Sequence, residues 1–219
     1  RDLRMSRGLG DVYKRQGEYS LYFARKGYEV SALELADANI AAFKKKLTPE
    51  DKIDLVQGNA LDLSRYADKS FDIVLLFGPL YHLKNDADKQ KCISEAKRVC
   101  KDGGKIFFAF ISNDFVFLTE FGYDVNYFSN GDYDKETFKL NDFPFVFHTV
   151  GAARKLLADG GINILHEVAS DGASELLAAR INEMSDEDYT QYLRYHFYIC
   201  EKPELLGMTN HLLFMGEKK

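Results

Sequence analysis

The feature that most constrains the fold is an apolar run near the middle of the chain, Phe71 to Phe77 (FDIVLLF), which only Asp72 interrupts. A run of this length, rich in Val, Ile and Leu, is typical of a strand buried on both faces, as in a parallel sheet covered by helices. Gly78-Pro79 ends the strand, because proline has no amide to donate and glycine permits a sharp turn. Tyr81 and His82 follow directly. They are either ligand-binding residues at the carboxyl edge of an α/β sheet or ordinary residues of an exit loop.

Strand-like and helix-like patterns alternate along most of the chain. Strands are expected over 28–34, 53–57, 71–77, 105–111, 162–168 and 211–216, and helices over 18–26, from 37, over 86–101, over 149–159 and from 185. This alternation implies right-handed βαβ units and a mostly parallel, doubly wound sheet flanked by helices. The predicted fold class is therefore α/β.

Two details of this pattern depend on a few residues. The Gly103-Gly104 pair is expected to end the helix over 86–101. The helix from 185 carries an apolar stripe that is expected to face the protein, formed by Tyr189, Leu193, His196, Phe197 and Cys200.

Residues 112–148, here called the cap segment, interrupt the alternation. They hold eleven of the protein's aromatic residues (13 Tyr and 17 Phe), well above their share by length. A cap that lines a pocket explains this content better than a solvated loop does. The sequence thus predicts one domain over 17–219 with an aromatic-rich cap insertion.

Composition excludes several classes of protein. The formal net charge of −5 disfavours nucleic acid and anionic membranes as partners. Three cysteines, Cys92, Cys100 and Cys200, show neither metal-type spacing nor an even disulfide set, so a cytoplasmic, reducing location is expected. No apolar run approaches the length of a membrane span, and no His/Cys/carboxylate cluster suggests a metal.

Residues 1–16 (RDLRMSRGLGDVYKRQ) differ in character from the residues after them. Five basic residues and two aspartates interrupt every apolar group, so no buried strand is available there. We interpret this stretch as a foreign lead-in, such as translated adapter sequence, that replaces a native segment. The alternative is a disordered basic arm.

Glu34 ends the second expected strand, 17 residues after Gly17. This gap is near the roughly 20 residues that dinucleotide folds leave between the glycine turn and a ribose-binding acid. A carboxylate suits that role because it can accept from both ribose hydroxyls. The alternative for an acid at a strand end is a surface ion pair.

Taken together, four segments resemble the class I S-adenosylmethionine-dependent methyltransferases, particularly those that act on small molecules. The segments are GEYSLYFARKGYEVSALE from Gly17, GNALDL from Gly58, FDIVLLFGPLYHL from Phe71 and CKDGGKIFFAF from Cys100. The resemblance covers roughly 17–111, and HLLFMG from His211 fits the antiparallel last strand of that family.

The resemblance implies S-adenosylmethionine as cofactor and a small-molecule methyl acceptor. Gly17 would be the last glycine of the turn under the cofactor's methionine part. Glu34 would hold the ribose hydroxyls, with Leu35 beside it in the cofactor site. Asn59 and Ala60 would border the adenine, although the family more often has Asp where Asn59 stands. Phe77, Tyr81 and His82 would face the methionine end and the acceptor.

The same resemblance implies a first strand and earlier glycines before Gly17, and residues 1–16 contain nothing equivalent. Methyl transfer needs a base only if the acceptor must lose a proton, and His82 or Tyr81 would then serve. The other histidines are expected to be structural, namely His148, His166, His196 and His211. A nicotinamide-dependent oxidoreductase and a non-catalytic cofactor-binding module are the competing hypotheses. The acceptor and the oligomeric state are left open.

Overall fold

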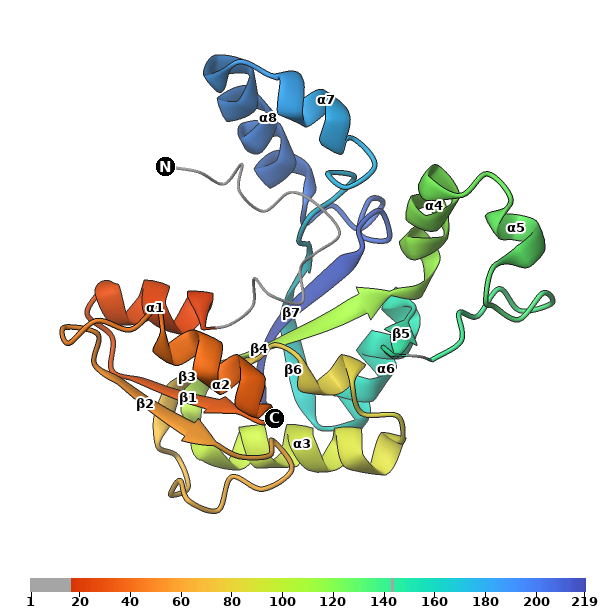
Figure 1. Ribbon diagram of the computed structural model, residues 1–219. Helices are drawn as coiled ribbons and strands as arrows, with labels where there is room; N and C mark the ends of the chain where they lie inside the picture. Colours follow the sequence, from red (N-terminus) through yellow and green to blue (C-terminus); the bar gives the residue numbers. More distant parts are fainter. Residues whose placement is uncertain (1–16, 143) are drawn as a thin grey trace. The chain divides into compact units, whose positions relative to one another are not determined.

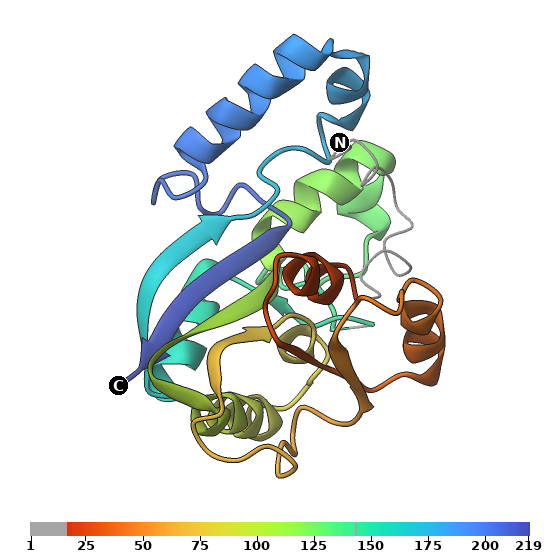
Figure 2. The ribbon, with the colours of Figure 1, turned by 90° about the vertical axis from the view of Figure 1, so that its left-hand side faces the viewer.

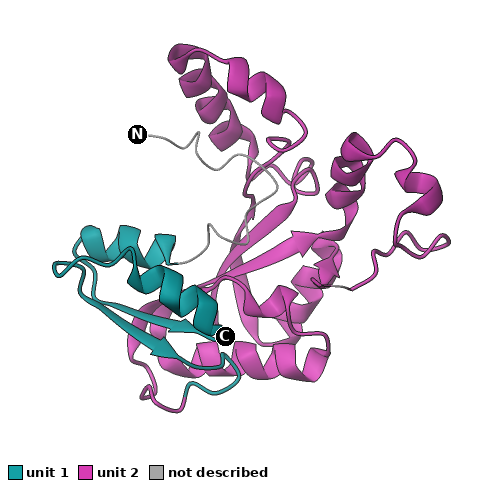
Figure 3. Cartoon of the chain, in the orientation of Figure 1, with its two compact units in different colours: residues 1–63 teal, residues 64–219 magenta. Residues whose placement is uncertain are grey.

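The computed structural model describes residues 17–142 and 144–219, and the predicted lead-in, residues 1–16, lies outside the described residues. The chain divides into two compact units, one up to Leu63 and one from Ser64 onward (Figure 3). Each unit contains its own sheet. A single domain over 17–219 therefore stays a prediction.

The first unit alternates helix and strand twice. Its elements are α1 (Glu18–Arg25), β1 (Val30–Glu34), α2 (Asp37–Lys44) and β2 (Ile53–Gln57) (Figure 1). The two strands pair in parallel, from Val30 opposite Ile53 to Glu34 opposite Gln57. Parallel strands need a crossover, and α2 supplies it. These four elements agree with the sequence-based prediction to within a few residues.

Phe43, on α2, is the centre of this unit's core and is 3% exposed. Gly17 comes directly before α1 with φ +81°, and a Cβ built on it would lie 2.3 Å from the Phe43 ring. Only glycine fits this position, because any side chain would meet both the strained backbone and the ring. Arg25 closes the other end of α1 through two 2.9 Å bonds to Asp51.

The second unit contains the remaining helices and strands. They are β3 (Phe71–Leu76), the 3-10 turn η3 (Pro79–Tyr81), α3 (Asp86–Val99), β4 (Cys100–Ser112), α4 (Asn113–Tyr123), α5 (Tyr127–Asn130), β5 (Phe147–His148), α6 (Val150–Asp159), β6 (Ile162–Ala169), α7 (Ala178–Glu183), α8 (Asp186–Ile199) and β7 (His211–Lys218).

The sheet of the second unit has the order β3-β4-β7-β6. The pairing of β3 with β4 is parallel, whereas β7 is antiparallel to both β4 and β6 (Figure 2). It follows that β3, β4 and β6 share one direction and end at one edge of the sheet. This confirms the predicted α/β fold with a mostly parallel sheet and an antiparallel last strand.

The short strand β5 pairs with the same edge of β4 as β3 does, beyond the point where β3 ends. Pairing of β3 ends with Leu76 opposite Phe108, and β5 pairs with β4 farther along, at Ile111 and Ser112. The end of the cap segment therefore lies next to the carboxyl end of β3.

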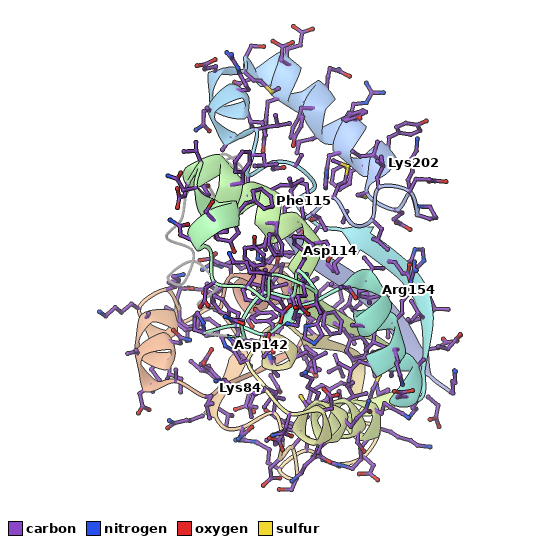
Figure 4. All side chains as sticks on the ribbon, turned by 90° about the vertical axis from the view of Figure 1, so that its right-hand side faces the viewer. Lys84, Asp114, Phe115, Asp142, Arg154 and Lys202 are labelled. Carbon is purple, nitrogen blue, oxygen red and sulfur yellow. The ribbon has the colours of Figure 1, made fainter. Side chains whose placement is uncertain are left out.

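Helices α3 and α6 pack on the sheet and on each other. The inner face of α3 is fully buried at Cys92, Ile93 and Ala96. Lys97 donates to the carbonyl oxygen of Gly160 at 2.8 Å. Arg154, labelled in Figure 4, joins α6 to β6 through Glu167 at 2.7 and 2.5 Å.

Three expectations are wrong in detail. Strand β3 is not buried on both faces, because Ile73 is 47% exposed; among the described residues β3 has a strand neighbour on one side only. The Gly103-Gly104 pair does not end a helix but lies within β4. A Cβ on Gly104 would lie 2.8 Å from the carbonyl oxygen of Asp72, so this glycine permits close approach of β3.

The third wrong expectation concerns α8. This helix has no buried residue, and Phe197 is 72% exposed. One face of α8 borders an apolar cavity of about 190 Å³, and Phe197 is not among the residues that line it. Its walls include Tyr192, His196 and Cys200.

The cap segment has a small core of its own, as its aromatic content suggested. Phe117, Tyr133 and Leu140 form a buried cluster. Asn113, at the start of α4, fixes this cluster to the sheet: its amide nitrogen donates to the carbonyl oxygen of Phe138 at 3.0 Å, and its oxygen accepts from the amide of Leu140 at 2.9 Å. Such a buried, fully bonded amide holds the segment in one arrangement.

Candidate active site

Five of the residues implied by the resemblance lie in the first unit, at the carboxyl ends of β1 and β2 or, for Gly17, directly before α1. One Glu34 oxygen accepts from the amide of Ala36 at 2.9 Å. The other, Oε2, has no hydrogen-bond partner within the described ranges, so it can accept from a ligand hydroxyl. The Glu34 carbonyl oxygen accepts from the amide of Gly58 at 3.0 Å, which brings the two strand ends together. Leu35 follows Glu34 and is 64% exposed.

Asn59 lies in the turn after β2, next to Glu34 in the adjacent strand. Its Oδ1 accepts from the amide of Leu61 at 3.0 Å, which orients the side chain and leaves the amide nitrogen as a donor. Ala60 is half-buried beside it. Gln57 completes this edge by donating to Asp37 at 2.7 Å. The first unit thus presents an acceptor at Glu34, a donor at Asn59 and an apolar side chain at Leu35.

The other three predicted site residues lie in the second unit, after β3. Phe77 follows the strand and is half-buried. Tyr81 is 2% exposed, whereas His82 is exposed, and their rings lie 5.0 Å apart. Of these two side chains, His82 is therefore the more accessible to a ligand.

The cap segment contacts this loop directly. The Phe145 ring lies 6.1 Å from the ring of Tyr81 and 5.2 Å from that of His82. The Tyr81 carbonyl oxygen also accepts from the amide of Val146 at 2.9 Å. The structure thus brings together two features that the sequence placed more than 60 residues apart, because β5 takes over the edge of β4 that β3 leaves.

A pocket of about 200 Å³ opens within the cap segment. Four of its lining residues are apolar or aromatic, and three carry a carboxylate or an amide: Val116, Glu120, Tyr127, Asp132, Leu140, Asn141 and Phe147. Burial, and the nearby Glu175 carboxylate, raise the pKa of Glu120 above its ordinary value. The aromatic content predicted the cap segment, but no sequence signal identified these polar residues.

His148 differs from the other histidines. It is 5% exposed, and among the described residues neither ring nitrogen has a hydrogen-bond partner. Burial, with the nearby charges of Lys89 and Lys139, lowers the pKa of His148 to about 4. In contrast, His211 Nδ1 lies 2.7 Å from Asp171, and this contact contributes to the lowered pKa of the Asp171 carboxyl. His148 is therefore a buried, neutral imidazole.

The described part of the chain offers no metal site. In residues 17–142 and 144–219, no three His, Cys, Asp or Glu side chains are grouped so as to hold a metal ion. None of the helices described above combines the length and the apolar character needed to cross a membrane.

Comparisons of this chain with known proteins find similarity to methyltransferases. A model of the methyltransferase domain matches residues 14–108. A demethylmenaquinone methyltransferase of Clavibacter sepedonicus is 31% identical over 116 residues, which are 52% of this chain and 45% of that protein. The chain spans less than half the length of the curated relatives it matches.

Solved structures agree in fold. A structure of S-adenosylmethionine-dependent methyltransferases from Methanosarcina mazei superposes with a TM-score of 0.58 at 17% identity, covering 93% of this chain and 88% of that one. A 1,6-didemethyltoxoflavin-N1-methyltransferase of Burkholderia thailandensis, solved with S-adenosylhomocysteine, gives 0.53 at 14% identity over 93% and 67%. At such identities the likeness concerns the fold alone. Residues 14–108 thus match a methyltransferase domain, and the α/β topology of the chain is the fold of the S-adenosylmethionine-dependent methyltransferases among these structures.

Proposed function

We propose that the protein transfers a methyl group from S-adenosylmethionine to a small-molecule acceptor. The observation that carries the proposal is the pair of adjacent strand ends in the first unit, which present Glu34 and Asn59 side by side within the segment matched by the methyltransferase model. When bound, S-adenosylmethionine supplies an electrophilic methyl group on a sulfonium centre. The protein's part is to bind, to align and to exclude water.

The residues of the first unit fit this cofactor. The Oε2 oxygen of Glu34 would accept from the ribose hydroxyls, while the Ala36 amide keeps the carboxylate oriented. Leu35 and Ala60 would border the adenine, and the Asn59 amide would bond its edge. Gly17 would lie under the methionine part, where its missing side chain leaves the backbone accessible. These roles follow the family resemblance, and the local hydrogen bonds support them.

In the second unit we assign the acceptor side to Phe77, Tyr81 and His82. An acceptor that must lose a proton would give it to His82, whose side chain is exposed. Tyr81, which is buried and bonded through its carbonyl oxygen to Val146, would position the loop. The relatives suggest a small molecule as acceptor, and the pocket of the cap segment supports this proposal. A reducing, cytoplasmic location is part of the proposal and is compatible with three free, buried cysteines.

Calorimetry and turnover test the proposal. S-adenosylhomocysteine and NAD are titrated into the chain as given and into a version whose residues 1–16 are exchanged for a family-type strand and glycine-rich turn. We expect binding of S-adenosylhomocysteine, more strongly in the exchanged version, and no binding of NAD. Turnover is then followed as S-adenosylhomocysteine release with a panel of alcohols, amines and thiols. Selective NAD binding would favour an oxidoreductase, and cofactor binding without turnover would favour a non-catalytic module.

A further inference from the structure

The pocket of the cap segment is lined by apolar and aromatic side chains together with two carboxylates. Leu140 is buried, and Tyr127 and Phe147 pack on the same aromatic cluster. The lining includes the carboxylates of Glu120 and Asp132, and none of the described residues that line the pocket is a lysine or an arginine. Aromatic faces and carboxylates together are the chemistry that binds a cationic nitrogen.

Within 17–142 and 144–219, the carboxylates around this pocket form no ion pair with a lysine or arginine, unlike many other carboxylates of the protein. Within the described residues, Glu120 makes no hydrogen bond or ion pair through its side chain. Among the same residues, the Asp132 carboxylate accepts only from the side-chain amide of Asn141. Glu175, the like-charged neighbour of Glu120, is bonded only to neutral groups, at 3.3 Å from the Tyr123 hydroxyl and 2.5 Å from the Asn210 amide. In this part of the described chain, these carboxylates thus have no basic side chain paired to them.

Two lysines of the cap segment, Lys135 and Lys139, lie near this pocket, and both bond to groups other than its carboxylates. Lys139 donates to Asp142 at 2.7 Å and to the carbonyl oxygens of Leu140 and Phe147 (Asp142 is labelled in Figure 4). Lys135 stands 3.9 Å from the centre of the Tyr133 ring and donates to three backbone carbonyls. Lys139 Nζ also stands 6.0 Å from the centre of the Phe147 ring, but among the described residues neither lysine is paired with Glu120 or Asp132.

We propose that this pocket binds the methyl acceptor and that the acceptor is an amine with a compact apolar or aromatic body. Its ammonium group would lie between Glu120 and Asp132, and its body would lie on Tyr127, Leu140 and Phe147. Binding of a cation relieves the repulsion between Glu120 and Glu175. This repulsion also contributes to the raised pKa of Glu120, so protonation and an ammonium ion are alternative ways to neutralise that carboxylate.

The reaction itself favours this class of acceptor. The ammonium first gives a proton to the imidazole of His82, the base proposed above, and becomes the neutral amine. The nitrogen lone pair then forms the N–CH₃ bond while the S–CH₃ bond breaks, and its electron pair stays on sulfur in S-adenosylhomocysteine. The positive charge therefore moves from sulfur to nitrogen, and an acidic pocket stabilises it there. The role as methyl acceptor depends on the proposed function, whereas amine binding does not.

A charge series tests the inference on the full chain. Benzylamine, benzyl alcohol and benzoate have matched shapes and carry a positive, a neutral and a negative group. We expect ligand-observed NMR to show binding of benzylamine at least about tenfold tighter than either of the others, as one hydrogen bond to a charged group is worth. Equal binding of all three, or no binding of benzylamine to the folded protein, would overturn the inference.

Matched variants locate the charge that matters. Glu120→Gln removes the pocket carboxylate and should weaken benzylamine binding about tenfold. Glu136→Gln, the same change at an exposed residue outside the pocket lining, should leave binding unchanged. Equal weakening by both would mean that net charge, not the pocket, attracts the amine. Melting curves check that Glu120→Gln is folded, and Asp132→Asn serves as a second variant.

The proposed function is tested separately, by calorimetry with S-adenosylhomocysteine. Cofactor binding without amine binding would overturn only the inference. Amine binding without cofactor binding would leave the pocket assigned and the methyltransferase proposal without support.

Discussion

Glu34 ends β1 with one carboxylate oxygen already held by a backbone amide, at 2.9 Å from Ala36. Because this bond fixes the side chain before a ligand binds, ordering the side chain does not reduce the free energy of binding. The remaining oxygen then needs little reordering to accept from a hydroxyl. At the level of single residues, this preorganisation is what the strand-end position alone did not reveal.

We predict that Glu34→Ala weakens binding of S-adenosylhomocysteine. Loss of hydrogen bonds to a charged group should cost about 1.5–3 kcal/mol, or roughly 10- to 150-fold in Kd, measured by calorimetry in the version with residues 1–16 exchanged. Glu29→Ala is the matched control, because Glu29 is exposed just before β1. An unchanged Kd for Glu34→Ala would remove Glu34 from the cofactor site.

The buried imidazole of His148 predicts a pH dependence of stability. Its pKa is about 4 in the folded protein and near 6.5 when unfolded, so between these values the unfolded chain binds a proton that the folded protein does not. Stability should therefore fall as the pH falls from about 6.5 toward 4. The ion pairs Lys89–Asp86 and Lys139–Asp142 face the ring and leave no net charge to favour protonation.

Urea unfolding of the wild type and of His148→Phe measures this effect. From about pH 7.5 to pH 5, His148 should contribute a loss of about 1–2 kcal/mol in the free energy of unfolding. Over the same pH range, the free energy of unfolding of His148→Phe should fall by about that much less than that of the wild type. All other titrating groups are the same in the two proteins. Identical pH profiles would show that His148 binds its proton equally in both states.

At the level of helices and strands, the local sequence pattern predicted an element correctly where the element's own residues determine its structure. The helices expected over 149–159 and from 185 are present, and Thr149 and Ser185 cap them. Expectations failed where a distant partner decides. Gly104 permits the close approach of β3, and Ile73 is exposed on a strand that has one strand neighbour among the described residues. The contact of Phe145 with Tyr81 and His82 was equally invisible, since it depends on how β5 pairs with β4.

The two glycines that flank helix α1 allow the energetic cost of a strained backbone to be measured separately from the cost of a steric clash. Gly17 and Gly27 flank the helix at φ +81° and +92°, but only Gly17 has atoms within 4 Å of a built Cβ, the Phe43 ring. Gly27→Ala should cost about 1–2 kcal/mol for the left-handed backbone. Gly17→Ala should cost about 1–3 kcal/mol more because of the overpacking.

Chemical denaturation of both alanine variants gives the comparison. The double variant Gly17→Ala with Phe43→Leu should recover part of the extra loss. Equal losses at the two glycines would mean that the Phe43 ring moves aside without cost.

At the level of the whole molecule, the described residues form two sheets rather than one. In these residues β1 has a strand neighbour only in β2, and β3 has one only in β4. Open strand edges leave amides and carbonyls without partners. The match to the methyltransferase domain begins at residue 14, so it includes little of the residues before Gly17.

We predict that exchanging residues 1–16 for a family-type strand and glycine-rich turn stabilises the protein. An added strand would bond an open edge, and its turn would bring backbone amides to the cofactor. The melting temperature should rise, and S-adenosylmethionine should raise it further in the exchanged version than in the chain as given. A chain that the cofactor already stabilises to the same extent would show that residues 1–16 are native or dispensable.

The two-residue strand β5 links the pocket of the cap segment to the loop after β3. Phe147 borders the pocket of the cap segment, and Val146, the residue before it, donates to the carbonyl oxygen of Tyr81 at 2.9 Å. A ligand that shifts Phe147 therefore acts on the bond that holds the Tyr81 loop. Because linkage is reciprocal, the conformation of that loop changes the ligand's affinity by the same factor. Occupancy of the pocket and the geometry of the loop after β3 are thereby coupled through the hydrogen bond of the Val146 amide.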